Sequence, residues 1–232
     1  MEYRVEKKYL VTEADLAAIA GRLKQVMLQD IHQHGSFYNI RSIYFDDLQN
    51  HCAFENEAGL DQREKYRIRI YDGSASLIHL EIKEKIHGFT KKRACSLSQD
   101  ECSQILDGNL SLSLDERKPL NQLLLHMQCI NLRPNVLISY DRTAFTYPAG
   151  NVRITFDRNI AVTNRLDTFF ASHPLSLVPV LPKGIHVLEV KYDECLPDFI
   201  AQLLELGSLQ QIAFSKYYLG CLAVRNDFPV NP

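Results

Sequence analysis

Apolar and polar residues alternate in several stretches of this 232-residue chain, with the period of two that is typical of half-buried β-strands. These stretches are rich in Val, Ile, Tyr and Phe, and turn residues such as Asp-Gly and Pro-Ala-Gly separate them. The pattern predicts about eight strands, over residues 2–10, 37–45, 64–71, 77–85, 88–97, 136–145, 151–160 and 185–193.

A helical period replaces the alternation in five stretches. Thr12 is an N-cap candidate before the amphipathic residues 13–27, and Ser98 stands in the same position before a short helix with an acidic first turn. Further helices are expected at residues 114–129, 197–206 and 211–224. Strands with helices between and after them predict an α+β fold, and we expect a single domain over residues 1–232.

Charged side chains gather on one face of nearly every predicted strand. Residues two apart share a face, so each alternating set points to one side, while the opposite faces carry apolar residues such as Ile68, Leu80 and Leu188. The sets are Arg4, Glu6 and Lys8; Lys65, Arg67 and Arg69; His79, Glu81, Lys83 and Lys85; Lys91 and Arg93; Tyr140 and Arg142; Arg153, Thr155 and Asp157; and Glu189, Lys191 and Asp193.

Two arrangements of the sheet are compatible with this pattern. In a β-sandwich the charged faces would look at water and the apolar faces would form the core. In a closed antiparallel eight-stranded β-barrel with helices packed outside, the charged faces would line the interior. Exposed faces usually mix Thr, Ser and Gln with charges, whereas these strands repeat Arg and Lys with Glu. We therefore favour the barrel, whose lumen would bind a polyanion and a metal.

The composition of the whole chain indicates no particular partner. The hydrophobic fraction of 46% and the charged fraction of 23% are ordinary for a globular protein and exclude a disordered or fibrous class. The net charge is only −2, but nine basic residues lie between Arg63 and Arg93 against four acidic ones. The charge signal is therefore local.

Other features narrow the class of protein. The six cysteines form no Cys-x-x-Cys pair, as expected for free thiols in the cytoplasm. We expect no membrane segment, because no apolar run approaches the roughly 20 residues that span a bilayer. We expect no nucleic-acid partner, because the basic residues 91–93 lack interleaved aromatic residues. Gly-rich phosphate loops, Ser-His-Asp patterns and dinucleotide fingerprints are not found.

At the charged strands the sequence resembles the polyphosphate-polymerase (VTC) domain of the triphosphate tunnel metalloenzyme superfamily, also called CYTH-like. The matching pieces cover nearly the whole chain in the order of the family: RVEKKYLV, RSIYFDD, YRIRIY, LEIKEK, FTKKRA, ISYDRTAF, VRITFDRNI, VLEVKYD and FSKYYLG. The resemblance implies an antiparallel eight-stranded β-tunnel, in agreement with inward charged faces.

The resemblance also implies roles for individual residues. Seven would be catalytic: Lys8, Arg67, Arg69, Lys83, Arg142, Glu189 and Lys191. Five would bind phosphate: Lys91, Arg93, Tyr140, Arg153 and Lys216. Glu189 would be the main ligand of Mn²⁺ or Mg²⁺, with Glu6 and Glu81 as helpers.

One departure separates this chain from the wider superfamily. The superfamily opens with Glu-x-Glu-x-Lys, whereas this chain has Arg4, Glu6 and Lys8 at those positions. The missing acid favours the polymerase-like branch over two-metal triphosphatases. The function implied is ATP-dependent polyphosphate synthesis, with ATP or another nucleoside triphosphate, polyphosphate, and orthophosphate or pyrophosphate as partners. The alternatives are a triphosphatase or tripolyphosphatase, and a non-catalytic sensor of polyphosphate or nucleotide; the oligomeric state is left open.

Overall fold

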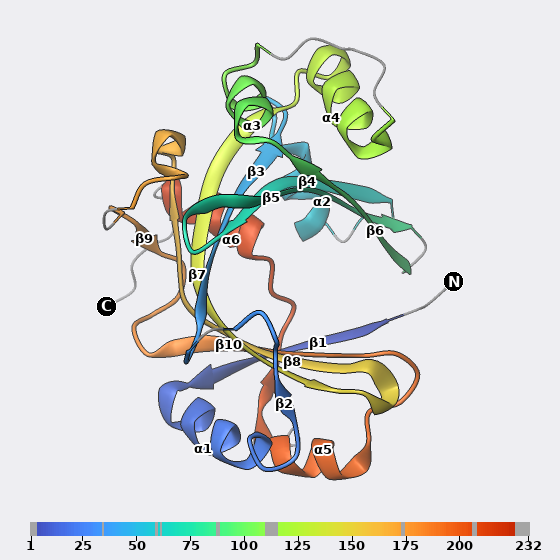
Figure 1. Cartoon of the computed structure of the whole chain (residues 1–232), viewed down its shortest axis with the longest axis vertical. Helices are drawn as coiled ribbons and strands as arrows, with labels where there is room; N and C mark the ends of the chain where they lie inside the picture. Colours follow the sequence, from blue (N-terminus) through green and yellow to red (C-terminus); the bar gives the residue numbers. More distant parts are fainter. Residues whose placement is uncertain are drawn as a thin grey trace. The chain divides into compact units, whose positions relative to one another are not determined.

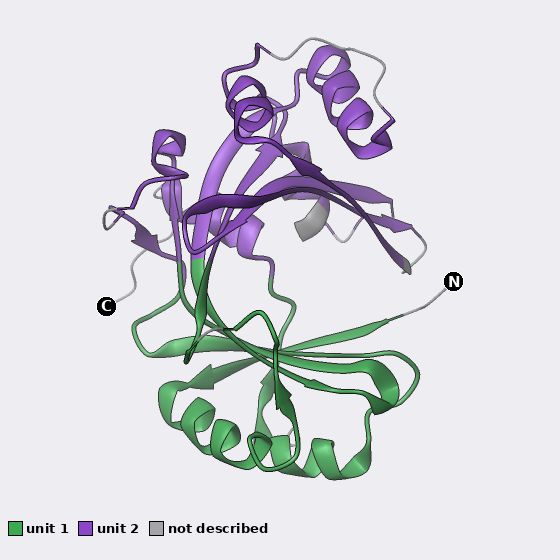
Figure 2. Ribbon diagram, viewed as in Figure 1, with its two compact units in different colours: residues 1–39, 140–160, 181–214 green, residues 40–139, 161–180, 215–232 purple. Residues whose placement is uncertain are grey.

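The computed structural model describes residues 4–33, 35–58, 60, 62–86, 89–109, 116–172, 175–205 and 208–225. They divide into two compact units, each assembled from three chain segments (Figure 2). Unit 1 comprises residues 1–39, 140–160 and 181–214, and unit 2 comprises residues 40–139, 161–180 and 215–232. That residues 1–232 form a single domain stays a prediction.

Unit 1 is an antiparallel sheet with helices on one face (Figure 1). Its main strands are β1 (Val5–Thr12), β10 (Ile185–Tyr192), β8 (Val152–Thr163) and β7 (Arg133–Tyr147), hydrogen-bonded in that order. Residues 161–163 of β8 and 133–139 of β7 belong to unit 2. The short strands β11 (Gln210–Gln211) and β2 (Leu28–Gln29) pair with β1 and β7, and a 3₁₀ turn, η1 (Ala149–Asn151), precedes β8. Helices α1 (Glu13–Leu23) and α5 (Asp198–Leu204) cover the apolar face.

The core of unit 1 follows from the alternation of its strands. Tyr9, Phe156 and Leu188 point to the helix-covered face, where Leu16 of α1 and Ile200 of α5 pack among them. Burial of such side chains removes apolar surface from water, which is the main favourable term in folding. The opposite face of the same strands therefore remains for the charged side chains.

Helix α1 begins where the sequence predicts. The Thr12 Oγ1 accepts a hydrogen bond of 3.2 Å from the Asp15 N–H, and the Asp15 carboxylate accepts one of 2.8 Å from the Thr12 N–H. This reciprocal capping box satisfies backbone donors that the first helical turn leaves without partners. Ser98 and Glu101 form the same box at the start of α3 (Gln99–Leu106).

Unit 2 is built around β3 (Tyr38–Asp46), β4 (Arg63–Tyr71), β5 (Ser74–Ile86) and β6 (Phe89–Leu97), which are paired in this order. Helices α3 and α4 (Lys118–Cys129) cover the apolar face of the sheet. The unit also holds α2 (His51–Glu57), α6 (Lys216–Val224), the 3₁₀ turn η2 (Leu166–Thr168) and β9 (Val178–Pro179), which pairs with β8. Ile68, Leu80 and Ile82 form the centre of its core with Leu123 of α4.

A two-residue turn joins β4 to β5. Asp72 and Gly73 both have positive φ, 51° and 67°, so that Tyr71 pairs with Ser74. Positive φ at both central residues is the requirement of a type I′ hairpin turn, for which Asp-Gly is a preferred sequence. The register shifts between Arg69 and Tyr71, and beyond this irregularity Arg67 lies opposite Glu81 and Lys65 opposite Lys83.

The prediction of a closed eight-stranded barrel is not confirmed. The described residues form one sheet of eleven strands, nine of which follow a hydrogen-bonded path from β11 to β6, while β2 and β9 pair beside it. No pairing of those residues closes the path. The predicted α+β class with a large antiparallel sheet is confirmed. The sequence did not predict α2 or the two-residue strands β2, β9 and β11, which are too short to show a period. Within the described ranges, every helix is too short or too polar to cross a membrane.

Candidate functional site

The first charged surface lies in unit 1, on the sheet face opposite α1 and α5. Lys8 of β1 pairs with Glu189 of β10, and Glu6 pairs with Lys191. On the other side of β10, Glu189 faces Thr155 and Lys191 faces Arg153 of β8. Residues paired across antiparallel strands share a face, so the predicted alternation of charges is confirmed here. We call this the Glu189 surface: Glu6, Lys8, Tyr140, Arg142, Arg153, Thr155, Asp157, Glu189 and Lys191.

Acidic and basic groups alternate across the Glu189 surface. The Nζ of Lys8 lies 3.1 Å from a Glu6 carboxylate oxygen and donates a hydrogen bond of 2.8 Å to the Phe214 carbonyl. The Nζ of Lys191 lies 3.3 Å from Glu189 and 3.7 Å from Glu6. Each carboxylate therefore separates cations that would otherwise repel one another.

Arg142 is the most firmly held cation of this surface. Its Nε and Nη2 donate to the two carboxylate oxygens of Asp157 at 2.7 and 2.8 Å, and Nη2 lies 3.6 Å from Glu189. Burial by itself would lower the pKa of Arg142, but Asp157, Tyr140 and Glu189 raise it well above its usual value. The guanidinium lies 5.2 Å from the centre of the Tyr140 ring. Such bidentate pairing fixes the plane of the guanidinium.

Arg153 is held at the same surface by different partners. Its Nη2 lies 2.6 Å from a carboxylate oxygen of Asp30 and donates a longer hydrogen bond, 3.4 Å, to the Tyr38 hydroxyl. Asp30 follows directly after β2, whose pairing with β7 places it. Neither Asp30 nor Tyr38 stands out in the sequence, because neither belongs to an alternating set of charges.

The Glu189 surface fits a divalent cation that arrives together with phosphate. Within the described parts of the chain, no three His, Cys, Asp or Glu side chains are grouped to hold a metal by themselves. Mg²⁺ usually binds through one or two carboxylates and substrate phosphates rather than through an all-protein cage. Glu189 and Glu6 would supply the carboxylates, and the buried Thr155 hydroxyl, which lacks a hydrogen-bond partner among the described residues, would supply another oxygen beside Glu189.

The second charged surface lies in unit 2, on the face of β3 to β6 opposite α3 and α4. Arg67 of β4 is paired with Tyr44 of β3 and with Glu81 of β5. Lys65 is paired with Lys83, which in turn faces Lys92 of β6. We call this the Glu81 surface: Tyr44, Lys65, Arg67, Arg69, Glu81, Lys83 and Lys92.

Glu81 is surrounded by cations. One of its oxygens lies 2.6 Å from the Arg67 Nη2 and 3.7 Å from the Arg69 Nη1, and the other contacts the Lys92 ammonium. Burial tends to raise the pKa of Glu81, but these three cations lower it far below its usual value. Because three cations already surround the carboxylate, a metal ion would be repelled there more strongly than at Glu189. Arg69 also donates to the Ser42 hydroxyl at 3.1 Å.

The placement predicted for Lys91 and Arg93 is wrong. Across β5 and β6, Glu84 faces Lys91 and Ile82 faces Arg93, so both lie on the face opposite Glu81. Arg93 there contacts Gln122 of α4, and its Nη2 lies 3.3 Å from Glu64 and 3.4 Å from Glu84. Lys92 takes the place on the charged face. The register decides this, since a shift of one residue exchanges the two faces of a strand.

Helix α6 brings its N-terminus to the Glu81 surface. Lys216 is the first helical residue, and the hydroxyl of the N-cap Ser215 accepts hydrogen bonds from the Lys65 ammonium at 3.1 Å and from the Tyr218 N–H at 3.3 Å. Of the residues predicted from the sequence, unit 2 therefore groups Lys216 with Arg67, Arg69, Lys83 and Glu81. Unit 1 groups Glu6, Lys8, Tyr140, Arg142, Arg153, Glu189 and Lys191.

Sequence reasoning assigned no role to five residues of these surfaces: Tyr44, Lys65, Lys92, Thr155 and Asp157. Asp157 lies on a predicted charged face but was assigned no role, although its position two residues after Thr155 was a usable signal. Tyr44 lies in the aromatic run IYF, which is typical of a buried strand and therefore gave no sign of a polar role. Lys92 could not be distinguished from Lys91 and Arg93 without the strand register.

Comparison with known proteins identifies relatives of the fold. A family model described as the VTC domain matches residues 3–225. A comparison with curated proteins finds no match. The crystal structure of a protein from Bacillus halodurans, provisionally described as an adenylate cyclase, is similar, with a TM-score of 0.54 and 15% identity over 92% of this chain and 94% of that one. The structure of the PH1819 protein from Pyrococcus horikoshii OT3 gives a TM-score of 0.48 and 13% identity, over 94% and 97% of the two chains.

Proposed function

The chain belongs to the VTC domain family. We propose that it catalyses metal-dependent phosphoryl transfer from ATP or another nucleoside triphosphate to a growing polyphosphate chain. The observation that carries the proposal is the Glu81 surface, where buried Glu81 orients Arg67 and Arg69 beside Lys92. Guanidinium groups fixed in this way recognise phosphate oxygens with defined geometry.

In this proposal the Glu81 surface binds phosphate groups. Arg67, Arg69, Lys83 and Lys92 supply positive charge, and Glu81 keeps the guanidinium groups apart and oriented. Lys216 adds a cation at the start of α6. Phosphoryl transfer depends mainly on positioning and on neutralising charge, so oriented cations supply much of what catalysis requires.

The Glu189 surface has a second role in the proposal. Lys8, Arg142 and Lys191 neutralise phosphate charge, and Arg153 and Tyr140 extend the binding surface. Glu189, with Glu6, would hold Mn²⁺ or Mg²⁺. When bound, such a metal neutralises phosphate oxygens as a Lewis acid. Asp157 keeps Arg142 in position during the reaction.

The reaction is an exchange of phosphate bonds. An oxygen of the acceptor, which is orthophosphate, pyrophosphate or the end of a polyphosphate chain, forms a bond to the γ-phosphorus of ATP. The bond between that phosphorus and the bridging β–γ oxygen breaks, and ADP leaves with the bonding electrons. The acceptor is one phosphate longer after each turnover. Throughout this exchange the lysine and arginine side chains hold the phosphate groups in line.

The test is incubation of the purified protein with ATP and Mn²⁺ or Mg²⁺. Polymer that runs as a ladder on a polyacrylamide gel, with ADP released in equal amount to phosphate incorporated, supports the proposal. Release of orthophosphate without polymer would instead identify a hydrolase, and binding of tripolyphosphate without turnover would identify a sensor. Glu189→Gln is expected to reduce turnover about 10²–10³-fold, whereas Glu194→Gln, at an exposed position, is the matched control.

A cytoplasmic location completes the proposal. All six cysteines are free of disulfides, and Cys102 and Cys221 are buried. Free thiols are the rule in reducing compartments. Fractionation of cells that express the protein, followed by immunoblotting, tests this assignment.

A further inference from the structure

The side chain of Arg67 is fixed by a tyrosine as well as by Glu81. Its Nη1 donates a hydrogen bond of 2.9 Å to the hydroxyl of Tyr44, while its Nε donates one of 2.6 Å to Glu81. Burial raises the pKa of Tyr44, but Arg67 and Arg69 lower it by more, so the net shift is downward. A phenol beside two guanidinium groups is a good acceptor, and the contact restrains the long arginine side chain.

Tyr44 is itself held by an aromatic residue far away in the chain. Its ring stacks on Tyr217 of α6, with 5.0 Å between the ring centres and an angle of 17° between the planes. Both side chains are buried, and the two residues belong to the same unit. Stacked aromatic pairs add about 0.5–1.5 kcal/mol beyond the area that they bury. The position of the Tyr44 ring therefore depends on that of Tyr217.

Tyr217 is anchored at its hydroxyl. This hydroxyl donates to the carboxylate of Asp46 and accepts a hydrogen bond of 2.9 Å from the Asn135 side-chain amide. Burial and the nearby Cys221 and Asp46 raise its pKa, so it keeps its proton and remains a donor. Asp46 in turn accepts from the N–H groups of Cys52 and Ala53, at 2.9 and 3.1 Å, at the start of α2. The carboxylate is thus fixed by backbone donors.

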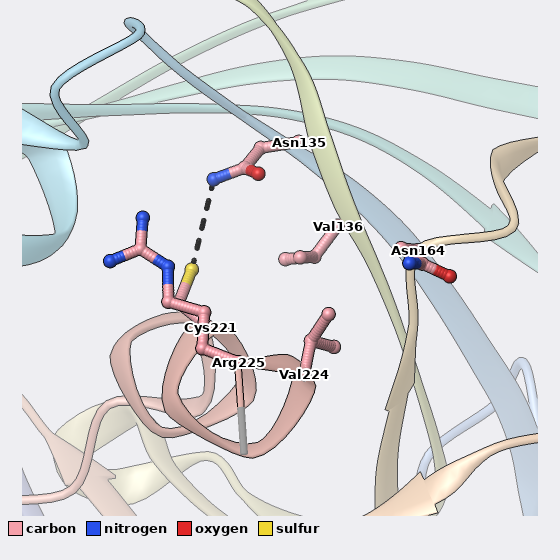
Figure 3. Close-up of a pocket in the computed structure, with 6 residues that line it drawn as sticks. All are labelled: Asn135, Val136, Asn164, Cys221, Val224 and Arg225. Carbon is pink, nitrogen blue, oxygen red and sulfur yellow. Dashed lines mark hydrogen bonds between the residues drawn. The ribbon is translucent and has the colours of Figure 1, made fainter. Parts of the chain in front are cut away.

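A small cavity adjoins this anchor (Figure 3). Its volume is about 140 Å³, and Asn135, Val136, Asn164, Cys221, Val224 and Arg225 line it. The Asn135 amide nitrogen lies 3.8 Å from the Cys221 sulfur. Burial raises the pKa of the Cys221 thiol to about 11, so in the folded protein it reacts slowly with alkylating agents. Cys221 therefore reports whether the packing around Tyr217 is intact.

We infer that Tyr217 and Tyr44 are positioning residues that orient Arg67 for phosphate. The line of contacts runs from the backbone of α2 through Asp46, Tyr217 and Tyr44 to the guanidinium of Arg67. It connects a helix of the C-terminal segment to a strand residue that would bind the substrate. This inference rests on the proposed function, because it assigns Arg67 a phosphate ligand.

A thermodynamic cycle separates positioning from simple packing. Binding of tripolyphosphate without metal is measured by calorimetry for the wild-type protein, Arg67→Ala, Tyr217→Phe, Tyr44→Phe and the double variants that combine Arg67→Ala with each tyrosine change. If the tyrosines act through Arg67, each Tyr→Phe change weakens binding about tenfold alone and has no further effect in the Arg67→Ala background. Equal weakening in both backgrounds would overturn the inference.

The controls keep this test decisive. Tyr147→Phe removes a hydroxyl in unit 1 and is expected to leave binding unchanged. Alkylation of Cys221 must stay slower than that of the exposed Cys129 and Cys195 in each variant. If Tyr217→Phe fails this criterion, the Tyr44→Phe cycle decides, because that change leaves the Tyr217 hydroxyl and its contacts with Asp46 and Asn135 in place. Unchanged binding in Tyr44→Phe overturns the inference.

The same measurements distinguish this inference from the proposed function. If wild-type protein does not bind tripolyphosphate, or if Arg67→Ala binds it equally well, the proposed function fails together with the inference. If Arg67→Ala loses binding while both Tyr→Phe variants bind like the wild type, the proposed function stands and only the positioning role is lost. The measurements therefore show whether the proposed function or only the positioning role of the two tyrosines has failed.

Discussion

The Glu189 surface and the Glu81 surface begin from the same short pattern, a glutamate followed two residues later by a lysine, and both glutamates are about equally buried, with 5% and 4% of the side chain exposed. They differ in their neighbours across the strands. Glu189 lies between Lys8 and Thr155, whereas Glu81 is paired with Arg67 and Ala94. Lys191 contacts its glutamate directly, while Lys83 is paired with Lys65 and Lys92.

This difference changes what each surface can bind. The named side chains of the Glu189 surface include four cations and three carboxylates, whereas those of the Glu81 surface include five cations and one carboxylate. A nearly balanced set suits a divalent cation together with phosphate, and a strongly positive set suits phosphate alone. The lesson is that a Glu-x-Lys strand has no fixed role, because the residues on neighbouring strands decide it.

The largest expected effect concerns the buried pair of the Glu189 surface. Asp157→Ala should lower the free energy of unfolding by about 3–5 kcal/mol, because it leaves the Arg142 guanidinium buried without its bidentate partner. Denaturation with urea, followed by circular dichroism, measures the change. Asp167→Asn, in an exposed pair with Arg165, is the control and should give no measurable shift. If Asp157→Ala lowers the free energy of unfolding no more than Asp167→Asn does, the buried pair of Asp157 and Arg142 is not the stabilising contact described here.

The second prediction separates the two glutamates by their roles. Glu189→Gln should reduce turnover with ATP about 10²–10³-fold while metal-free binding of tripolyphosphate persists, since the change removes a group that acts in the transition state. Glu81→Gln should instead raise KM and weaken metal-free binding, because Arg67 and Arg69 lose their shared partner. Steady-state kinetics and calorimetry distinguish the variants. Identical profiles would show that the two surfaces do not differ as proposed.

The third prediction uses the lowered pKa of Glu81. Its folded-state pKa lies below the usual 4.5, so its stabilising contribution is fully present above pH 4.5 and is lost as the pH falls below that value. At pH 7, Glu81→Gln should cost about 1.5–3 kcal/mol, the range for hydrogen bonds to charged groups. The difference in the free energy of unfolding between Glu81→Gln and the wild type should become smaller as the pH falls. Unfolding measured from pH 7 to pH 3 tests this, and a constant difference contradicts it.

The smallest expected effect tests the register of β6. Lys92→Ala should weaken tripolyphosphate binding about tenfold, or about 1.4 kcal/mol, because it removes a cation from the Glu81 surface. Arg93→Ala, one residue further on, should leave binding nearly unchanged while lowering stability, since Arg93 contacts Gln122, Glu64 and Glu84 on the other face. Calorimetry and urea denaturation of both variants provide the comparison. The reverse result would restore the predicted phosphate-binding role of Arg93.

Much of the fold could be predicted because its signals are local. The strict period of two placed Lys8, Glu189 and Arg67 on the charged faces where the register confirms them. Thr12 and Ser98 marked the starts of two helices, because a capping box needs only four consecutive residues. The family resemblance is likewise confirmed by the match over residues 3–225.

The errors arose where distant segments decide the outcome. Alternation within β6 groups Lys91 with Arg93 and separates both from Lys92, but only pairing with β5 determines which set lies beside Glu81. The contact between Tyr217 and Asp46 joins residues 171 positions apart, so no local pattern could indicate it. The closed barrel was inferred from facing charges, although charge on one face does not determine how the edges of a sheet pair.

The sequence by itself determined which residues of each strand share a face, where the capped helices begin, and to which family the chain belongs. These properties follow from the geometry of single elements, in which neighbours in sequence are neighbours in space. The tertiary structure alone decided which carboxylate meets which cation, which face of β6 lies beside Glu81, and which aromatic residues contact Arg67 and one another. Strand register and the docking of α6 fix these contacts, because the partners approach only when the chain is folded.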